Sequence, residues 1–471
     1  MIPLTNSLGS LGWKTFFLWL VLLIPGIVGF LKGQGFNDLY KNYWGQLLPS
    51  ANLHVTEAVV LIFIFVPVFL LYWRAIKISR RSRLVEVTAW TTLFTVTLML
   101  LFPFACDDIY YYIASGQLQA TYEMNPYFKT AHQVSHWSMD PFLRTTGWGF
   151  LLSPYGPIWN MTSSLLVVSA NDQFWLAVGL FKAFAGLLHM INFFLIGFIA
   201  KQLDLHPSQA MTIYGWNPLI LFELPGHAHN DVLLLLFLII AFVCLATKWK
   251  LLALPFLTLS AMVKYTSVLL GPLIMLWLLH KKKYLPLVFG TFLSILLIPL
   301  VWIPYWNGLD TLEGLFRQIN FYSIKSLHYL LLNSLPQWFP HMLKTQAFLL
   351  SSWVMLVLFG ITYFLLLFFL WRQKKQLDII GLARFGCIAF LLYLFFVNKW
   401  FQPWYFSWMI PLVALTRWPC AISLTALLLS CTAELSRVPQ LLFENNGFLV
   451  QVLTVIIIWL PLVTYRQIKN F

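Results

Sequence analysis

The feature that most limits the fold of this chain is a series of long, continuous apolar runs. Runs of about 18 residues or more can cross a bilayer as α-helices, and such runs recur between residues 16 and 464. They do not alternate, as the strands of a membrane barrel would. Charged residues make up only 10% of the 471 residues, against roughly 25% in a soluble domain. The sequence predicts an all-α polytopic membrane protein, with residues 1–471 as a single transmembrane domain.

The net charge of +14 would suggest a nucleic-acid partner in a soluble protein. Here the basic residues occupy short loops between apolar runs, a pattern typical of cytoplasmic loops, so no nucleic acid is expected. When the clusters at 74–83, 248–250, 281–283 and 372–375 are all placed in the cytoplasm, the runs between them cross the membrane in consistently alternating directions. This parity predicts a multi-pass protein of the cell membrane with both termini cytoplasmic.

Two stretches do not fit as single spans. Residues 251–279 have basic clusters at both ends and must cross an even number of times, so we expect a hairpin of two short helices that meet near Lys264. Residues 157–170 are too short to span and are expected to form a re-entrant or interfacial helix. Two long outer loops, at 105–156 and 306–346, remain. Single spans are expected at 16–31, 57–73, 84–104, 174–199, 208–224, 228–247, 284–305, 347–371, 378–397, 403–417, 419–435 and 447–464.

Asp107 and Asp108 are adjacent carboxylates where the third span meets the outer face. A partly buried carboxyl at such a place can have a raised pKa and act as a general base. The alternative is a solvated pair in the headgroup region, and tyrosines 110–112 fit an aromatic belt there.

Residues 226–231 read Gly-His-Ala-His-Asn-Asp and also fall on the outer side. The alternation of His227, His229 and Asp231 resembles a metal site. However, residues at i and i+2 point to opposite sides of a strand and about 200° apart on a helix, so chelation by both histidines is awkward. Hydrogen bonding to a substrate, or helix capping by Asn230 or Asp231, are the other interpretations.

Two further segments carry polar groups to the same side. Lys264 at the hairpin tip is suited to hold a phosphate near the bilayer, although a snorkelling lysine is the simpler interpretation. Gln402, Trp404 and Tyr405 could stack on a sugar or could belong to the aromatic belt. The convergence of all four segments on one side predicts a site at the outer membrane boundary, open to a membrane lipid as substrate.

No cofactor is predicted. The five cysteines have no C-x-x-C spacing, which supports neither a disulfide framework nor a zinc site. Phosphate-binding, dinucleotide and zinc-protease motifs do not occur in the sequence. The sequence therefore does not support a divalent metal, although one is possible.

Four segments of the chain resemble, in their sequence and in their order, the polyprenyl-phosphate-mannose-dependent mannosyltransferases of bacteria, which have the glycosyltransferase type C fold. The resemblance is most specific at Asp108-Ile109-Tyr110-x-Tyr112 and at Asn125-Pro126-Tyr127. Tyr155-Gly156-Pro157, the segment 226–231 and Gln402-Pro403-Trp404-Tyr405 follow. Two departures are the sequence Ser115-Gly116-Gln117, where the family has charged residues, and one extra residue after Gly226.

The resemblance implies a bundle of roughly 11–14 transmembrane helices and inverting transfer of mannose or another hexose from a polyprenyl-phosphate donor. The acceptor would be a glycan, a glycolipid or another hydroxyl compound. One of Asp107 and Asp108 would be the general base, and Lys264 and Arg317 would hold the phosphate. The resemblance also implies substrate contacts for a set of matching residues, namely Tyr112, Asn125, Tyr155, His227, His229, Asn230, Asp231, Gln402, Trp404 and Tyr405.

Two other function classes remain open at the level of sequence. A transporter or flippase of lipid-linked glycans would need a polar route across the membrane, and Lys182 and Arg384 are the main charges inside the spans. A membrane acyltransferase would need a catalytic histidine, which His227 or His229 could provide, but it would leave the paired aspartates unexplained.

Overall fold

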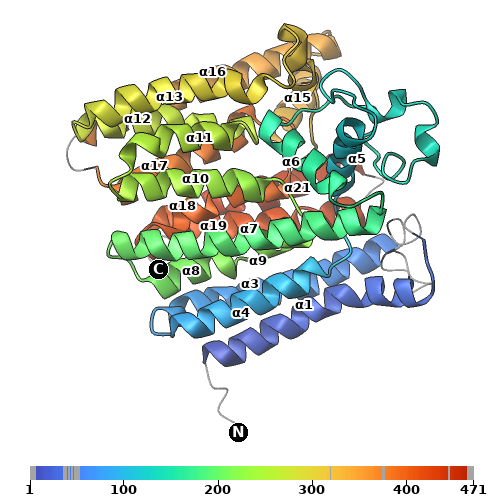
Figure 1. The fold of residues 1–471 in the computed structure, drawn as a ribbon, viewed down its shortest axis with the longest axis horizontal. Helices are drawn as coiled ribbons and strands as arrows, with labels where there is room; N and C mark the ends of the chain where they lie inside the picture. The colour runs from blue at the N-terminus through green and yellow to red at the C-terminus, as the bar shows by residue number, and fades with distance from the viewer. Residues whose placement is uncertain are drawn as a thin grey trace.

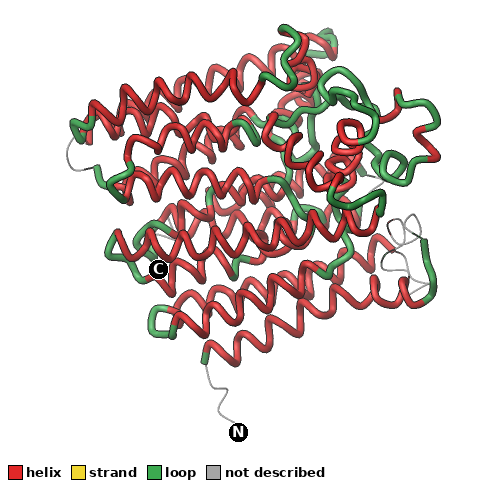
Figure 2. Tube along the Cα trace, viewed as in Figure 1, coloured by secondary structure: helices red, strands yellow, loops and turns green. Residues whose placement is uncertain are grey.

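The computed structural model is a bundle of α-helices (Figures 1 and 2). It describes residues 7–35, 40, 43, 46, 53–318, 320–373, 377–443 and 446–463, and none of these residues forms a strand. Helices satisfy their own backbone hydrogen bonds, which is what a chain in lipid requires. The predicted all-α polytopic membrane fold is confirmed.

Seven helices of the described chain are long and apolar enough to cross a membrane. At 1.5 Å per residue, the shortest of them extends about 28 Å, close to the hydrocarbon thickness. These seven are α1 (Leu8–Leu31), α3 (Leu53–Ser79), α7 (Phe174–Gln202), α13 (Tyr284–Trp302), α16 (Lys344–Gln373), α17 (Ile379–Leu392, continued by a π-turn at Tyr393–Val397) and α19 (Ala421–Leu435, continued by α20 at Val438–Leu442).

Four shorter apolar helices lie among them: α4 (Leu84–Met99), Lys250–Ala261, Tyr265–His280 and the part Leu449–Leu462 of α21 (Gly447–Val463). The predicted hairpin at 251–279 is confirmed as α11 (Ala253–Ala261), a 3-10 turn (Tyr265–Leu270) and α12 (Gly271–His280). Lys264 lies between its two arms. The short helix expected at 157–170 is α6 (Pro157–Val168).

Two expected spans are wrong as continuous helices. The stretch 208–224 divides into α8 (Pro207–Gly215), α9 (Pro218–Leu221) and a π-turn (Phe222–Gly226). The stretch 403–417 is a 3-10 helix (Pro403–Trp408) followed by α18 (Ile410–Ala414). Prolines 218, 225, 403 and 411 explain the breaks, because a proline lacks the N–H that a continuous helix needs. The segment Pro218–Gly226 and α10 (Asp231–Ala246) form a pair bent by 118°.

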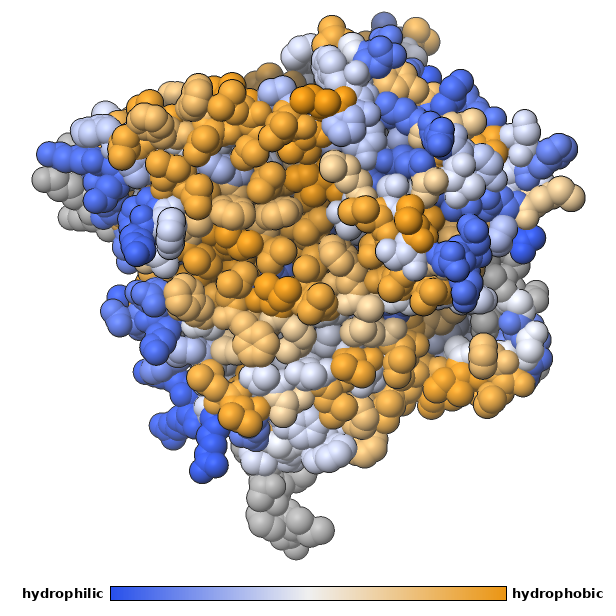
Figure 3. Space-filling view, in the orientation of Figure 1, coloured by the Kyte–Doolittle hydropathy of each residue, from blue (hydrophilic) through white to orange (hydrophobic). Residues whose placement is uncertain are grey.

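The loops divide between the two ends of the bundle. In Figure 1 the loops after α3, α10 and α12 lie at the left end, whereas α5 (Asp108–Ala120), α6 and α15 (Leu327–Trp338) gather at the right. Basic loops meet at the left: Arg80 Nε lies 2.7 Å from His206 Nε2. Figure 3 shows hydrophobic residues across the middle of the visible face and hydrophilic ones towards both ends. The predicted grouping of the basic loops at one end is thus observed.

Close packing fixes the elements at the right end. A Cβ on Gly116 of α5 would lie 2.6 Å from the carbonyl oxygen of Ser163, so only glycine allows α5 and α6 to approach this closely. A Cβ on Gly156 would lie 1.9 Å from the Met262 carbonyl oxygen, and the Gly156 N–H donates to Val263 at 3.0 Å. The start of α6 is therefore held against the tip of the 251–279 hairpin.

Candidate active site

Asp107 immediately precedes α5 and anchors the loop that follows it. Its Oδ2 accepts hydrogen bonds from Thr146 Oγ1 at 3.0 Å and from the Gly147 N–H at 2.7 Å. Burial raises the pKa of the Asp107 carboxyl to about 7, against the lowering effect of these two donors. A carboxyl of this kind titrates near neutral pH.

Asp108 is the first residue of α5 and lies at the centre of a polar cluster. Its Oδ2 accepts from the hydroxyls of Tyr112 at 3.3 Å and Tyr155 at 3.4 Å, and it lies 3.5 Å from His229 Nδ1. Burial alone would raise the pKa of Asp108, but the contact with His229 and the charge of Lys264 outweigh it and the pKa is lowered. The side chain is 18% exposed. Asp108 is therefore an ionised carboxylate that faces open space.

The bend after the π-turn aims the two histidines differently. Ala228 has φ +57°, in the left-handed region. His227 Nδ1 lies 2.9 Å from the Phe222 carbonyl, and His227 Nε2 accepts the Ala105 N–H at 3.3 Å. Both nitrogens of His227 thus bond to backbone groups. His229 instead faces Asp108 and stacks on Trp404, with 4.1 Å between the ring centroids.

Lys264 is held in place by Asp231, the first residue of α10. Its Nζ lies 3.1 Å from both Asp231 carboxylate oxygens, and Trp408 Nε1 donates to Asp231 Oδ1 at 2.5 Å. The ammonium also lies over the rings of Tyr405, at 4.6 Å, and Tyr155, at 6.0 Å. This ion pair is nearly buried, with Lys264 14% exposed. The arrangement fixes a cation at the hairpin tip, beside Tyr155.

Sequence reasoning missed a second buried ion pair. Glu223 lies within the π-turn. Its Oε1 accepts from Arg437 Nη2 at 2.5 Å, and its Oε2 lies 3.1 Å from His229 Nε2. Arg437 also donates to the Ala105 carbonyl at 3.2 Å. The available signal was a glutamate inside an apolar stretch, which is costly unless paired. Trp408, the partner of Asp231, was missed as well, although it closes the aromatic run 403–408.

Two cavities meet at Tyr155. The first, of about 260 Å³, includes Asp107 and Asp108, with Arg317 among its other polar side chains. The second, of about 590 Å³, contains Lys264 and is largely apolar. Both include Pro154, Tyr155, Gln318 and Trp400. Gln402 and Trp404 line the first cavity, and Tyr405 and Trp408 line the second.

Three further residues proposed from the sequence do not line either cavity, namely Asn125, Asn230 and Tyr112. Asn125 shapes a turn: its Nδ2 donates to the Tyr305 carbonyl at 3.0 Å and its Oδ1 accepts the Tyr127 N–H at 3.0 Å. Asn230 is buried, and its carboxamide has no hydrogen-bond partner among the described residues. Tyr112 is buried; it donates to Asp108, and its ring lies 5.2 Å from that of Tyr155. Arg317 lines the first cavity but is 60% exposed and pairs with Glu313 at 2.6 Å.

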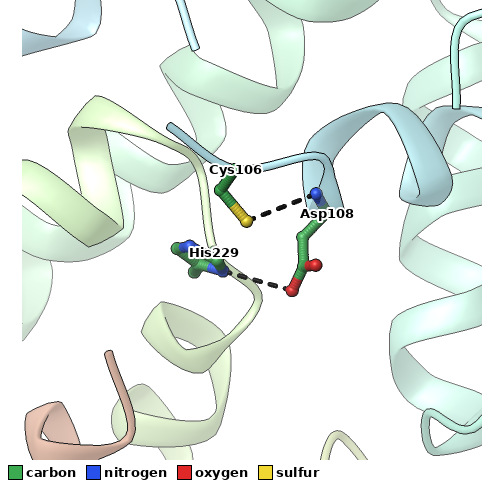
Figure 4. Close-up of side chains that lie close together, drawn as sticks. All are labelled: Cys106, Asp108 and His229. Atoms are coloured by element: carbon green, nitrogen blue, oxygen red, sulfur yellow. Dashed lines mark hydrogen bonds and ion pairs between the residues drawn. The ribbon is translucent and has the colours of Figure 1, made fainter. Parts of the chain in front are cut away.

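The described residues include one group that could hold a metal ion, and it differs from the alternating histidines of the sequence. Cys106, Asp108 and His229 each offer a ligand atom, and these atoms all lie within 4.8 Å of one another (Figure 4). His227 and Asp231 are not part of this group.

The fold and the site together define a polytopic α-helical membrane protein with a polar pocket at one end of its bundle and an apolar groove beside it. The chain belongs to the alpha-(1->6)-mannopyranosyltransferase family: the model for the N-terminal domain of that family matches residues 16–280, more than half of the chain. The protein is therefore a membrane glycosyltransferase of mannose. No curated protein and no solved structure matches it. The resemblance of the sequence to mannosyltransferases is confirmed.

Proposed function

We propose that this protein transfers mannose from a polyprenyl-phosphate donor to a hydroxyl group of a glycan or glycolipid acceptor, with inversion at C1 and formation of an α-(1→6) linkage. The linkage follows the description of the family. The observation that carries the choice of donor is the junction of the two cavities at Tyr155. An apolar groove that ends at a fixed cation suits a lipid chain that ends in a phosphate.

The groove has the composition that an isoprenoid chain requires. Its walls include Val268, Leu269, Leu356, Phe396 and Val397, and α16 on one side is among the least buried helices of the bundle. A lipid can therefore enter sideways from the bilayer. The phosphate would then lie beside Lys264, and the sugar would pass Tyr155 into the polar cavity.

The reaction follows from this placement. Asp108, ionised and open to the polar cavity, takes the proton of the acceptor hydroxyl as that oxygen attacks C1 of the mannose. The bond from C1 to the phosphate oxygen breaks on the opposite face of the ring, which inverts the configuration. Polyprenyl phosphate leaves with the electron pair, and the charge of Lys264 stabilises it. Asp107 is the second candidate for the base.

The sidedness rests on the positive-inside rule. The basic loops gather at the end of the bundle opposite to the cavities, and such loops are retained in the cytoplasm. The site therefore faces the outside of the cell membrane, and both termini are cytoplasmic. A Lys129→Cys variant in a cysteine-free background tests this, because Lys129 is exposed on the first outer loop. We expect labelling of intact cells by an impermeant thiol reagent; labelling only after permeabilisation contradicts the assignment.

The central experiment is transfer by the purified protein from a panel of polyprenyl-phosphate sugars, with release of lipid phosphate as the readout. Mannose should be transferred best. The Asp107→Asn/Asp108→Asn double variant should be inactive while it stays inserted and monodisperse. Transfer at the normal rate by that variant would refute the mechanism, and no transfer from any polyprenyl-phosphate sugar would refute the donor.

Neither competing function gains support. Lys182, one of the charges considered for a transport path, donates to the carbonyls of Leu101 and Gly226 at 2.5 Å, so it stabilises the backbone near the site. His227, considered for acyl transfer, has both nitrogens engaged with backbone groups. His227 lines none of the described cavities, and Lys182, which borders a separate cavity beside α1 and α7, has its ammonium on these two carbonyls.

A further inference from the structure

Three side chains at the polar cavity are of a kind that binds transition metals: Cys106 and Asp108 line it, and His229 is buried beside them. Cys106 Sγ, an Asp108 carboxylate oxygen and a His229 ring nitrogen all lie within 4.8 Å of one another, and the Asp108–His229 pair is 3.5 Å apart. Figure 4 shows that they come from two segments far apart in sequence and converge on one space. Sulfur, nitrogen and oxygen ligands together favour zinc and similar ions over magnesium or calcium.

The surroundings orient these three groups as the outer partners of a metal site do. The Nε2 of His229 faces Glu223 Oε2 at 3.1 Å, while its Nδ1 faces Asp108. A carboxylate behind a histidine in this way directs the other nitrogen towards a metal. The Sγ of Cys106 accepts the Asp108 N–H at 3.4 Å. His229 is fully buried, so among the described residues its two ring nitrogens have only these near neighbours to face.

The site is also accessible. Cys106 and Asp108 both line the polar cavity, so three protein ligands would leave a fourth position open towards it. This is the coordination of zinc sites that exchange ligands, whereas purely structural zinc sites are closed by four protein ligands.

We propose that Cys106, Asp108 and His229 bind one Zn²⁺-class ion and that its binding inhibits transfer. The inhibition rests on the proposed function: an Asp108 carboxylate bound to a divalent cation cannot accept the proton of the acceptor hydroxyl. Binding converts the Cys106 thiol to a thiolate, and its proton passes to the solvent.

Metal binding is tested without any activity assay. The purified full-length protein is titrated with Co²⁺, which reports a thiolate ligand by a charge-transfer band and a four-coordinate site by strong visible bands. We expect one equivalent to bind and Zn²⁺ to displace it. Cys106→Ser should remove the charge-transfer band and weaken Zn²⁺ binding at least about tenfold. Cys431→Ser, in α19 and outside the lining of both cavities, is the matched control and should bind as the wild type does.

His229→Gln serves as a second variant in case Cys106→Ser fails to fold, and it should weaken binding by a similar factor. The absence of a charge-transfer band in the wild type, or its persistence in Cys106→Ser, would overturn the site.

Inhibition is measured separately. Low Zn²⁺ should block mannose transfer by the wild type and by Cys431→Ser, and Cys106→Ser should need at least about tenfold more. Stimulation by Zn²⁺, or equal inhibition of all three proteins, would overturn the inhibitory role. If no donor supports transfer at all, the proposed function fails, while the cobalt spectra still decide whether the metal site exists.

Discussion

The two cavities that meet at Tyr155 differ in what forms their walls. The polar cavity is lined largely by residues of loops and helix ends, among them Asp107, Asp108 and Gln402. The apolar groove takes one wall from α16, which turns most of its surface outward, and much of the rest from the turn at 264–269 and the segment 393–400. Polar groups thus collect where the helices end or break, and the apolar walls are continuous with the lipid-facing surface of the bundle.

This difference predicts separate effects of substitution. A change in the polar cavity should slow transfer from every donor, because it acts on the reacting atoms. A change in the groove should act through the lipid chain, so its effect should grow with the length of that chain. A groove variant whose defect is the same for short and long donors would remove the distinction.

The largest effect is expected for Asp108→Asn. Loss of a general base costs about 10²- to 10⁴-fold in rate, and the amide keeps the size of the side chain. Asp107→Asn should cost only about tenfold, because Asp107 Oδ2 already accepts hydrogen bonds from Thr146 and Gly147. Single-turnover rates at saturating donor measure both. A greater loss for Asp107→Asn than for Asp108→Asn would exchange their roles.

The next largest effect on transfer is expected for Lys264, the cation proposed to lie beside the donor phosphate. Lys264→Gln alone would leave the buried Asp231 carboxylate unpaired, at a cost of about 3–5 kcal/mol in stability. The Lys264→Gln/Asp231→Asn double variant removes both charges together. We expect it to fold but to transfer about 10²-fold more slowly. Lys344→Gln, at the exposed start of α16, is the control for a lysine elsewhere. Wild-type rates in the double variant would exclude Lys264 as the phosphate ligand.

A smaller effect is expected at the junction. Tyr155→Phe removes the hydroxyl that reaches Asp108 at 3.4 Å and keeps the ring between the cavities. The loss of one hydrogen bond to a charged group, about 1.5 kcal/mol, corresponds to roughly tenfold in kcat/KM. Tyr265→Phe removes a hydroxyl that donates to the Tyr155 carbonyl at 3.3 Å, and it should leave kcat/KM nearly unchanged. Equal losses in both variants would point to a general loosening of the loop.

The sequence predicted much of this arrangement, because charged residues are rare in an apolar chain and basic loops fix the side on which each falls. Asp108, His229, Asp231 and Lys264 were assigned to one side by this argument, and the structure places His229 against Asp108 and Asp231 against Lys264. The hairpin around Lys264 followed from the same reasoning.

The remaining features depend on side-chain direction and long-range packing, which periodicity does not contain. The choice between His227 and His229 is made by the π-turn and by the positive φ of Ala228. The partner of Glu223 is Arg437, 214 residues away. The breaks at 208–224 and 403–417 were signalled by prolines, but the apolar character of both stretches outweighed that signal.

The smallest expected effect lies in the groove. Leu356→Trp enlarges a side chain that lines the groove on α16, and it should displace part of a long isoprenoid chain. The loss of contact with one or two methylene groups, at about 0.8 kcal/mol each, corresponds to roughly a four- to fifteenfold increase in KM for a long-chain donor. A donor with a single isoprene unit should be unaffected. Leu358→Trp is the control, since Leu358 is on the same helix, similarly exposed, and does not line the groove. If Leu358→Trp raises KM as much as Leu356→Trp, the donor chain lies along the outer surface of α16 and the groove is not its binding site.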